Sequence, residues 1–247
     1  MTDYPNPLPP RFVRSPEDFF EMPEEYRKLV VHQMKVHTEG EATGSDDYAR
    51  IFYPMTKDPY EKMMCCHLAA EEMDHHLLGL DVLKSIGVDA SYMADLHMKD
   101  RKLFDNEVVK KIDTWAERGF FAFIAEAAAF AQIEEFSRSS YQPIAEMTES
   151  ILRDEKGHIA HGHRIVLNLC RTAEGKAEAQ GALNRMWPAT LDLFGRSDSP
   201  RSAAYVRWGL RQLRNNDARV RFAAATRPKL EKLGLTVPDD NLNRKFV

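Results

Sequence analysis

The four-residue segment Glu72-Met73-Asp74-His75 recurs as Glu155-Lys156-Gly157-His158, and this repetition decides the fold. In an α-helix, residues three apart project from one face, so each segment presents a carboxylate beside an imidazole. A further carboxylate precedes each segment: Glu41 lies 31 residues before Glu72, and Glu126 lies 29 residues before Glu155. One Glu-x-x-His arises often by chance, but four helices carrying Glu, Glu-x-x-His, Glu and Glu-x-x-His supply the ligands of a ferritin-like dinuclear metal centre.

Hydrophobic periodicity predicts four long helices around these residues. We expect them over residues 23–44, 60–86, 119–139 and 143–170, with Pro54 and Pro59 separating the first two. A glycine follows each motif histidine by four residues, so the two helix pairs read as two versions of one hairpin. Residues 88–118 are expected to form a crossover, and three more helices are expected over 175–194, 200–214 and 216–234. The predicted fold class is all-α: a ferritin-like four-helix bundle with one long crossover and additional C-terminal helices.

The composition is that of an ordinary globular protein. The chain has 247 residues, of which 43% are hydrophobic and 29% charged, and its net charge is −4. This size fits one domain with a substantial core. We expect a proline-rich, extended N-terminal arm over residues 1–15 and a single ferritin-like di-iron domain over residues 16–247. The overall charge argues against a nucleic-acid partner.

The cysteines and the apolar segments indicate the compartment. Cys65, Cys66 and Cys170 cannot form a disulfide framework and are interpreted as reduced thiols. The first residues lack the pattern of a signal peptide. The most apolar segment, residues 119–133, is too short to span a bilayer and contains Glu126. We therefore expect a cytoplasmic protein with no membrane partner.

The carboxylates of the four-helix pattern lie on apolar helix faces. Glu126 is the sharpest case, because it is the only charged residue between Phe120 and Ala131. Burying an unpaired charge costs several kcal/mol, so these carboxylates need a cation. A single Glu on a solvated face, or a single core His bonded to a backbone carbonyl, is the simpler alternative, but it does not account for the whole set. We predict that six residues are both metal ligands and catalytic residues: Glu41, Glu72, His75, Glu126, Glu155 and His158.

An acidic residue stands directly before each ligand glutamate, as Glu71 and Asp154. We expect each to accept the N–H of the motif histidine on the opposite hairpin, which would fix the tautomer of that imidazole. A solvent-facing acid is an equally weighted alternative.

The donor set also indicates the metal. Four carboxylates and two imidazoles suit neither copper(I), which prefers sulfur, nor a magnesium or calcium cage built from oxygen alone. Two iron ions are predicted, with manganese as second choice. Two histidines for two metals leave open coordination positions, which suits O₂ as a co-substrate.

The chain resembles the catalytic subunits of ring-1,2-phenylacetyl-CoA epoxidases, a family of bacterial multicomponent di-iron oxygenases. The similarity covers roughly residues 20–242 and includes the six ligand positions, although the family has Asp at the position of Glu126. Four further segments carry it: Tyr26-Arg27-Lys28, Arg138-Ser139-Ser140-Tyr141, Asn184-Arg185-Met186-Trp187-Pro188-Ala189, and Leu233-Gly234-Leu235-Thr236-Val237-Pro238-Asp239.

The resemblance implies a substrate and partners. Lys99, Arg211 and Asn215 match positions that the family uses for substrate binding, whereas His32 and Leu68 replace basic residues that the family places against the CoA arm. It implies an aromatic or acyl-CoA substrate, an electron-donating reductase, and self-association or a hetero-oligomer with a structural subunit.

The leading hypothesis is a di-iron monooxygenase that epoxidises or hydroxylates an aromatic or acyl substrate, for example phenylacetyl-CoA, in phenylacetate catabolism. Two alternatives stay open: a ferritin-like iron-oxidising protein, and a non-catalytic subunit of an oxygenase complex. The phenylalanines near Glu126 are expected either to wall a substrate pocket or to be plain core: Phe120, Phe121, Phe123 and Phe130. Three arginines are expected to form one basic helical stripe that is either solvated or binds an acidic ligand: Arg207, Arg211 and Arg214.

Overall fold

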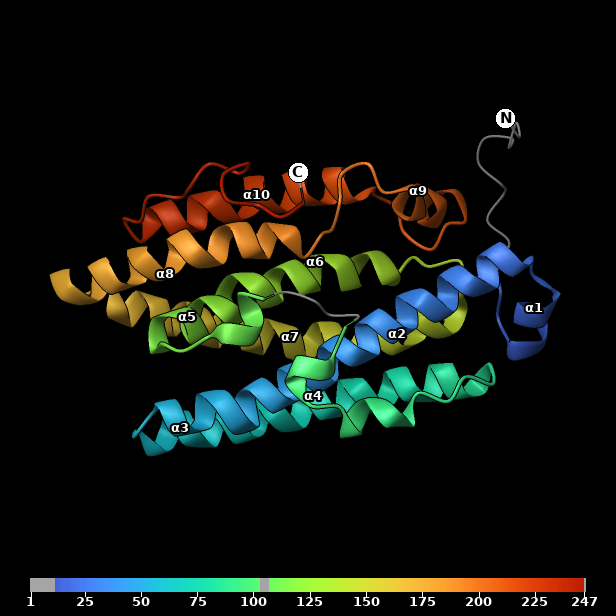
Figure 1. The fold of residues 1–247 in the computed structure, drawn as a ribbon, viewed down its shortest axis with the longest axis horizontal. Coiled ribbons are helices and arrows are strands. Elements are labelled where there is room, and N and C mark those ends of the chain that lie inside the picture. The colour runs from blue at the N-terminus through green and yellow to red at the C-terminus, as the bar shows by residue number, and fades with distance from the viewer. Residues whose placement is uncertain (1–11, 103–106, 247) are drawn as a thin grey trace.

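The computed structural model describes residues 12–102 and 107–246, in which every regular element is a helix (Figure 1). The prediction of an all-α fold is confirmed. Most of the predicted N-terminal arm lies outside the described residues. Its last residues contact the bundle, because Val13 donates to the Ser140 carbonyl and accepts from the Gln142 amide, each at 2.8 Å. Ser15 then caps the short helix α1 (Pro16–Glu21).

Two helical hairpins form the bundle. The first pairs α2 (Glu24–Asp46) with α4 (Pro59–Ser85). The second pairs α7 (Gln142–Leu169) with a segment that runs through α5 (Trp115–Phe120), η5 (Phe121–Ala125) and α6 (Glu126–Phe136). As predicted, short helices form the crossover between them: η2 (Ser91–Asp95), η3 (Met98–Asp100) and η4 (Val109–Lys111).

A C-terminal layer covers the second hairpin on the side away from α4 (Figure 1). It consists of α8 (Ala173–Asp192), α9 (Pro200–Arg207) and α10 (Asn215–Lys232). The helix predicted over 200–214 is shorter than expected, because Gly209 adopts a φ of 69° and ends it in a left-handed turn. The predicted basic stripe is therefore wrong: Arg207 closes α9 and pairs with Glu25 at 2.5 Å, while Arg211 and Arg214 lie beyond it.

Each hairpin contains one π-helical turn in its first helical segment. In the first hairpin, α2 continues through η1 (Asp47–Phe52) into α3 (Tyr53–Met55), and the Tyr53 amide bonds the Tyr48 carbonyl five residues back. The prediction that Pro54 interrupts this helix is wrong, because Pro54 lies in the first turn of α3, where no N–H is required. In the second hairpin the π turn η5 directly precedes Glu126. π turns are rare and often mark functional sites.

The glycine after each motif histidine lets the two helices of its hairpin approach closely. A Cβ added at Gly79 would lie 2.3 Å from the Thr38 hydroxyl oxygen on α2, and one at Gly162 would lie 2.4 Å from the Phe123 amide nitrogen on η5. The two contacts occupy equivalent places in the two hairpins, as the repeated spacing predicts. The helices thereby bring their ligand-bearing faces together.

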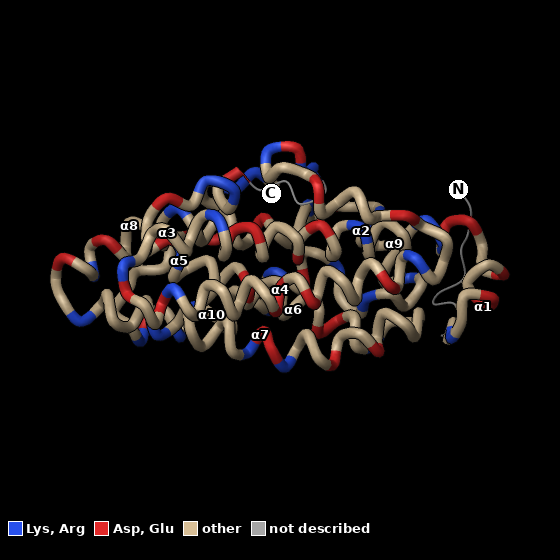
Figure 2. The backbone as a smooth tube through the Cα atoms, turned by 90° about the horizontal axis from the view of Figure 1, so that it is seen from below, with Lys and Arg blue, Asp and Glu red and all other residues tan. Residues whose placement is uncertain are grey.

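Charged residues lie along the outer helices with both signs interspersed (Figure 2). Across the described ranges, none of the helices combines the length and the apolar character needed to cross a bilayer.

The close approach at Gly162 predicts a position-specific effect of alanine. Gly162→Ala places a methyl group against backbone and should lower the free energy of unfolding by about 1–3 kcal/mol, the usual cost of overpacking. Gly157→Ala, on the same helix but facing open space, should raise it by about 0.5–1 kcal/mol, because alanine favours the helix. Denaturant titration of both variants measures the difference. Equal effects would contradict the close packing at Gly162.

Candidate metal centre

The six predicted ligands converge in the middle of the bundle, and each is at most 7% exposed. Donor atoms of Glu41, Glu72, His75 and Glu155 all lie within 4.8 Å of one another. Donor atoms of Glu72, Glu126 and His158 form a second group within the same limit. Glu72 belongs to both groups, so it is the residue that would contribute to both metal positions.

Local structure sets the position of these side chains. Glu41 comes from α2, the two Glu-x-x-His pairs come from α4 and α7, and Glu126 is the first residue of α6, directly after the π turn η5. Gly44 makes room for the shared carboxylate, because a Cβ at this position would lie 2.7 Å from Glu72 Oε2. The first helix of each hairpin therefore adapts locally to the site.

The two imidazoles have the same orientation. His158 Nδ1 lies 3.2 Å from Glu72 Oε1 inside the site, and its Nε2 lies 3.0 Å from Glu71 Oε2 on the opposite hairpin. His75 Nδ1 lies 3.5 Å from Glu41 Oε2, and its Nε2 lies 3.5 Å from Asp154 Oδ2. Each motif acid thus faces the histidine of the other hairpin. With the proton on Nε2, each Nδ1 lone pair points toward the carboxylates.

Four buried polar atoms of the predicted ligand residues have no hydrogen-bond partner among the described residues: His75 Nδ1, His158 Nδ1, Glu126 Oε2 and Glu155 Oε2. A buried polar atom without a partner costs about 1–3 kcal/mol. All four belong to residues whose donor atoms form the two groups described above. Oxygen and imidazole nitrogen in this ratio suit iron or manganese. The residues present therefore fit a pair of metal ions.

The pKa values at the centre reflect concentrated negative charge. Burial, together with the neighbouring glutamates, holds the pKa values of Glu72 and Glu155 well above their usual range. Burial also raises the pKa of Glu126, although His158 and Tyr48 oppose it. Because these carboxyl groups hold protons at higher pH, metal binding at the centre should release them.

Glu41 behaves differently from the other three carboxylates. Burial alone would raise its pKa, but His37 and His75 beside it outweigh burial and leave the pKa well below its usual range. The His37 Nδ1 to Glu41 Oε1 distance is 2.9 Å. Glu41 is therefore the carboxylate most readily ionised without metal.

Sequence reasoning missed the partners of two ligands. Tyr48 is fully buried and donates its hydroxyl to Glu126 Oε1 at 2.6 Å. Its ring lies 6.1 Å from that of His158. His37, which pairs with Glu41, resembles an ordinary core histidine in the sequence. Spacing could have indicated both residues, because His37 and Tyr48 lie one and two helical turns from Glu41.

A cavity of about 140 Å³ adjoins the centre. Besides ligand residues, its lining includes Phe121, Ile133, Phe136 and Arg211. Four phenylalanines near Glu126 were predicted either to wall a substrate pocket or to be plain core. Among the residues that the structure describes, Phe121 lines this cavity and the other three do not. Phe120 is core, whereas Phe123 and Phe130 line a separate groove between α6, α7 and α10.

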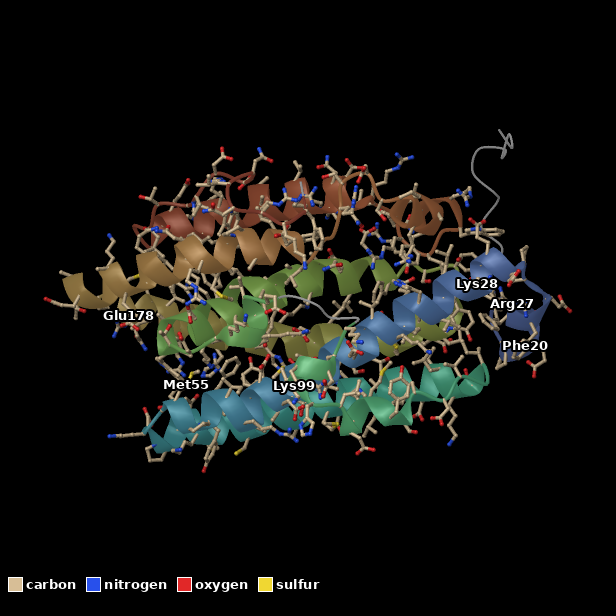
Figure 3. The ribbon with its side chains drawn as sticks, in the orientation of Figure 1. Phe20, Arg27, Lys28, Met55, Lys99 and Glu178 are labelled. Atoms are coloured by element: carbon tan, nitrogen blue, oxygen red, sulfur yellow. The ribbon has the colours of Figure 1, made fainter. Side chains whose placement is uncertain are left out.

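The three predicted substrate-binding residues do not lie together. Arg211 lines the cavity, with its guanidinium 4.9 Å from the Tyr205 ring centroid. Lys99 is exposed on η3 in the crossover (Figure 3). Asn215 begins α10, and its side chain donates to the Arg196 carbonyl at 3.1 Å. The geometry therefore places Arg211 at the site but not the other two.

Leu68 and His32, which the sequence resemblance places where the family has basic residues, make other contacts in this protein. Leu68 is buried in the hydrophobic cluster that contains Tyr48. His32 Nδ1 lies 2.8 Å from the Tyr205 hydroxyl, and its Nε2 lies 2.5 Å from Arg201. Burial, with Arg201 nearby, lowers the pKa of His32 to about 4, so this imidazole is neutral near pH 7.

Comparison with known proteins identifies the family of this chain. The family described as "Phenylacetic acid catabolic protein" matches residues 17–245. The chain belongs to this family. It is 29% identical over 237 residues to one of the subunits of the 1,2-phenylacetyl-CoA epoxidase of Escherichia coli (strain K12), and the match covers 92% of this chain and 74% of that protein. The family resemblance predicted from sequence is confirmed.

The hydrogen bond from Tyr48 predicts a measurable contribution to metal binding. Tyr48→Phe removes the donor that orients Glu126 and should weaken iron binding about 10–100-fold, the usual effect of losing a partner of a ligand. Anaerobic titration of the metal-free protein with ferrous iron measures this change. Tyr92→Phe, which removes a hydroxyl from an exposed ring on η2, is the control. Equal affinities in both variants would show that Tyr48 does not support the site.

The raised pKa of Glu72 predicts that replacing this carboxyl group stabilises the metal-free protein. The native chain holds this proton after the unfolded chain has lost it near pH 4.5, so stability falls as pH rises from that value toward the folded-state pKa. Glu72→Gln removes this penalty and should stabilise the metal-free form by roughly 1–3 kcal/mol at pH 8, with a smaller effect at pH 5.

Denaturant titrations at both pH values measure the effect, with Glu134→Gln on the exposed face of α6 as the control. The same variant should gain less stability than the wild type when iron is added. A metal-free Glu72→Gln protein that is less stable at pH 8 than the wild type would contradict the crowding of charge at Glu72.

Proposed function

We propose that this chain is a di-iron monooxygenase of phenylacetate catabolism. In the proposed reaction, a ring double bond of an aromatic acyl thioester such as phenylacetyl-CoA takes one oxygen atom of O₂, and two electrons and two protons convert the other atom to water. The observation that carries the proposal is the pair of overlapping, buried donor groups that share Glu72 and open onto a cavity. The epoxidase relative supports the choice of reaction.

In this proposal Glu41, Glu72, His75 and Glu155 hold one iron, and Glu72, Glu126 and His158 hold the other. Bound iron supplies the electrons and coordination sites with which O₂ is activated. The protein holds its ligands in place beforehand: Glu71 and Asp154 orient the two imidazoles, and Tyr48 orients Glu126.

The cavity wall supports an aromatic substrate. Phe121, Ile133 and Phe136 give it an apolar lining next to Glu126, which excludes water from the reacting ring. Arg211 adds a cation to this otherwise acidic cavity, and its Nε is buried with no hydrogen-bond partner among the described residues. We assign Arg211 to the polar part of the substrate. Arg201 lies on the same side, bonded to His32, and adds to the positive potential there.

The reaction consumes two electrons per O₂, so the proposal includes a reductase as electron donor. The relative belongs to an enzyme of more than one kind of chain, which supports assembly with a structural subunit or self-association. We place the reaction in the cytoplasm, where reduced cysteines are stable.

The proposal predicts an isotope-labelled product. The iron-loaded protein, supplied with electrons and ¹⁸O₂, should convert phenylacetyl-CoA into a product containing one ¹⁸O atom, detected by mass spectrometry. Arg211→Met should raise the KM for this substrate about tenfold or more, corresponding to loss of one charged contact. Arg214→Met, at an exposed arginine outside the cavity lining, should leave it unchanged.

Two results would contradict this function. Oxygen uptake that yields only ferric iron, with no oxygenated organic product, would favour the iron-oxidising alternative. Failure to bind iron in spite of correct folding would favour a non-catalytic subunit.

A further inference from the structure

A line of contacting side chains leads from the metal centre toward one end of the bundle. It starts at Tyr48, which donates to Glu126 at 2.6 Å. The guanidinium of Arg118 lies over the Tyr48 ring, 5.1 Å from its centroid. Arg118 in turn contacts His161, with its Nη2 at 3.0 Å from Nδ1. The Nδ1 atom therefore accepts, and the proton of this imidazole is on Nε2.

The line continues to the carboxylate of Glu61. The His161 Nε2–H donates to Glu61 Oε2 at 2.8 Å, and Arg164 Nη2 donates to Glu61 Oε1 at 2.6 Å. Burial, with Arg118 beside it, lowers the pKa of His161 to about 4, which agrees with a neutral ring. Arg164 lies over the Tyr60 ring, 5.1 Å from its centroid. Tyr60 is 51% exposed, so the line reaches solvent.

Arg118 places a charged side chain in the protein core, which is energetically unfavourable. It is fully buried, and its Nε and Nη1 have no hydrogen-bond partner among the described residues. A buried cation of this kind costs several kcal/mol. An apolar residue would pack against Tyr48, Phe52 and Trp115 at lower cost. Such a group points to a functional role near the site.

The surface where the line emerges is apolar with a basic rim. Tyr60 and Met63 lie three residues apart on α4, and Arg164 and Leu167 lie three apart on α7, so each pair shares a helix face. Met63 is 56% exposed and Leu167 is 38% exposed. Lys62 lies nearby, over the ring of the exposed Tyr53. This end of the bundle is the one where α3 meets α4, close to Met55 in Figure 3.

We propose that the surface formed by Tyr60, Met63, Arg164 and Leu167 docks the electron-donating partner, and that the line from Tyr60 to Glu126 carries its electrons to the metal centre. The inference rests on the proposed function. The partner is an acidic flavin or iron–sulfur protein, because the rim of the surface is basic and its middle apolar.

Physical reasons support this route. Electron tunnelling weakens steeply across empty gaps, and a continuous series of hydrogen bonds and ring contacts removes such gaps. Along α4, Tyr60 lies about 18 Å from Glu72, at 1.5 Å per residue, so a donor on the surface needs a connecting path. Per O₂, the partner is oxidised by two electrons, and two protons from solvent accompany them to form water. The side chains of the line are unchanged after each turnover.

A pair of surface variants tests the docking site. Met63→Glu places a negative charge in the surface and should repel an acidic donor, whereas Leu77→Glu, 50% exposed on the same helix, is about 21 Å away and is the matched control. The donor used is a plant-type [2Fe–2S] ferredoxin kept reduced by its NADPH-dependent reductase. Reduced methyl viologen, which needs no docking site, is the second donor.

Stopped-flow absorption of the ferric protein measures its reduction. Met63→Glu should slow reduction by ferredoxin about tenfold, equivalent to about 1.4 kcal/mol, and leave reduction by methyl viologen within twofold. Leu77→Glu should change neither rate. Binding of ferredoxin to the metal-free protein should weaken in Met63→Glu alone, which gives a readout that does not depend on iron.

The line itself is tested at His161. His161→Leu removes both of its contacts and should slow reduction by ferredoxin about tenfold without changing ferredoxin binding or iron content. His161→Gln keeps a donor and an acceptor and should restore most of the rate. Equal rates in His161→Leu and the wild type would overturn the route.

Equal ferredoxin rates in Met63→Glu and Leu77→Glu would overturn the docking site. If Met63→Glu instead breaks self-association seen by light scattering while reduction is unchanged, the surface joins subunits and the proposal is likewise wrong. A protein that binds ferredoxin as expected but holds no iron would count against the proposed function alone.

Discussion

The rest of the structure depends on the burial of four carboxylates at one point in the bundle. Glu72 and Glu155 lie among other acids in a core where ionisation is strongly disfavoured. The inward nitrogens of the two motif histidines have no hydrogen-bond partner in the part of the chain that the structure describes. A pair of cations would satisfy these atoms together, which is why the donor set matters more than any single contact.

The surrounding helices are shaped to allow this convergence. Gly79 and Gly162 bring the helices of each hairpin together, and Gly44 leaves space for the carboxylate shared by both donor groups. The π turn η1 carries Tyr48 and the π turn η5 precedes Glu126, and a hydrogen bond joins these two side chains. Local departures from ideal helix geometry therefore occur where the first helix of each hairpin passes the site.

The environment of Tyr48 also connects the site with the rest of the core. Leu68 packs in the same hydrophobic cluster, and Arg118 lies over the Tyr48 ring. The cavity beside the centre is lined by Phe121, Ile133 and Phe136 and also by polar side chains, among them Gln33, Thr43, Gln132 and Arg211.

The sequence by itself determined the helices, the all-α class, the family and the six residues that converge, because helix periodicity links spacing along the chain to direction in space. It also indicated that Glu71 and Asp154 face the opposite histidines. Only the tertiary structure decided the partners of these groups. The hydrogen bond from Tyr48 to Glu126 and the separation of Lys99 from Arg211 arise from packing between segments that are distant in the sequence, which no local pattern encodes.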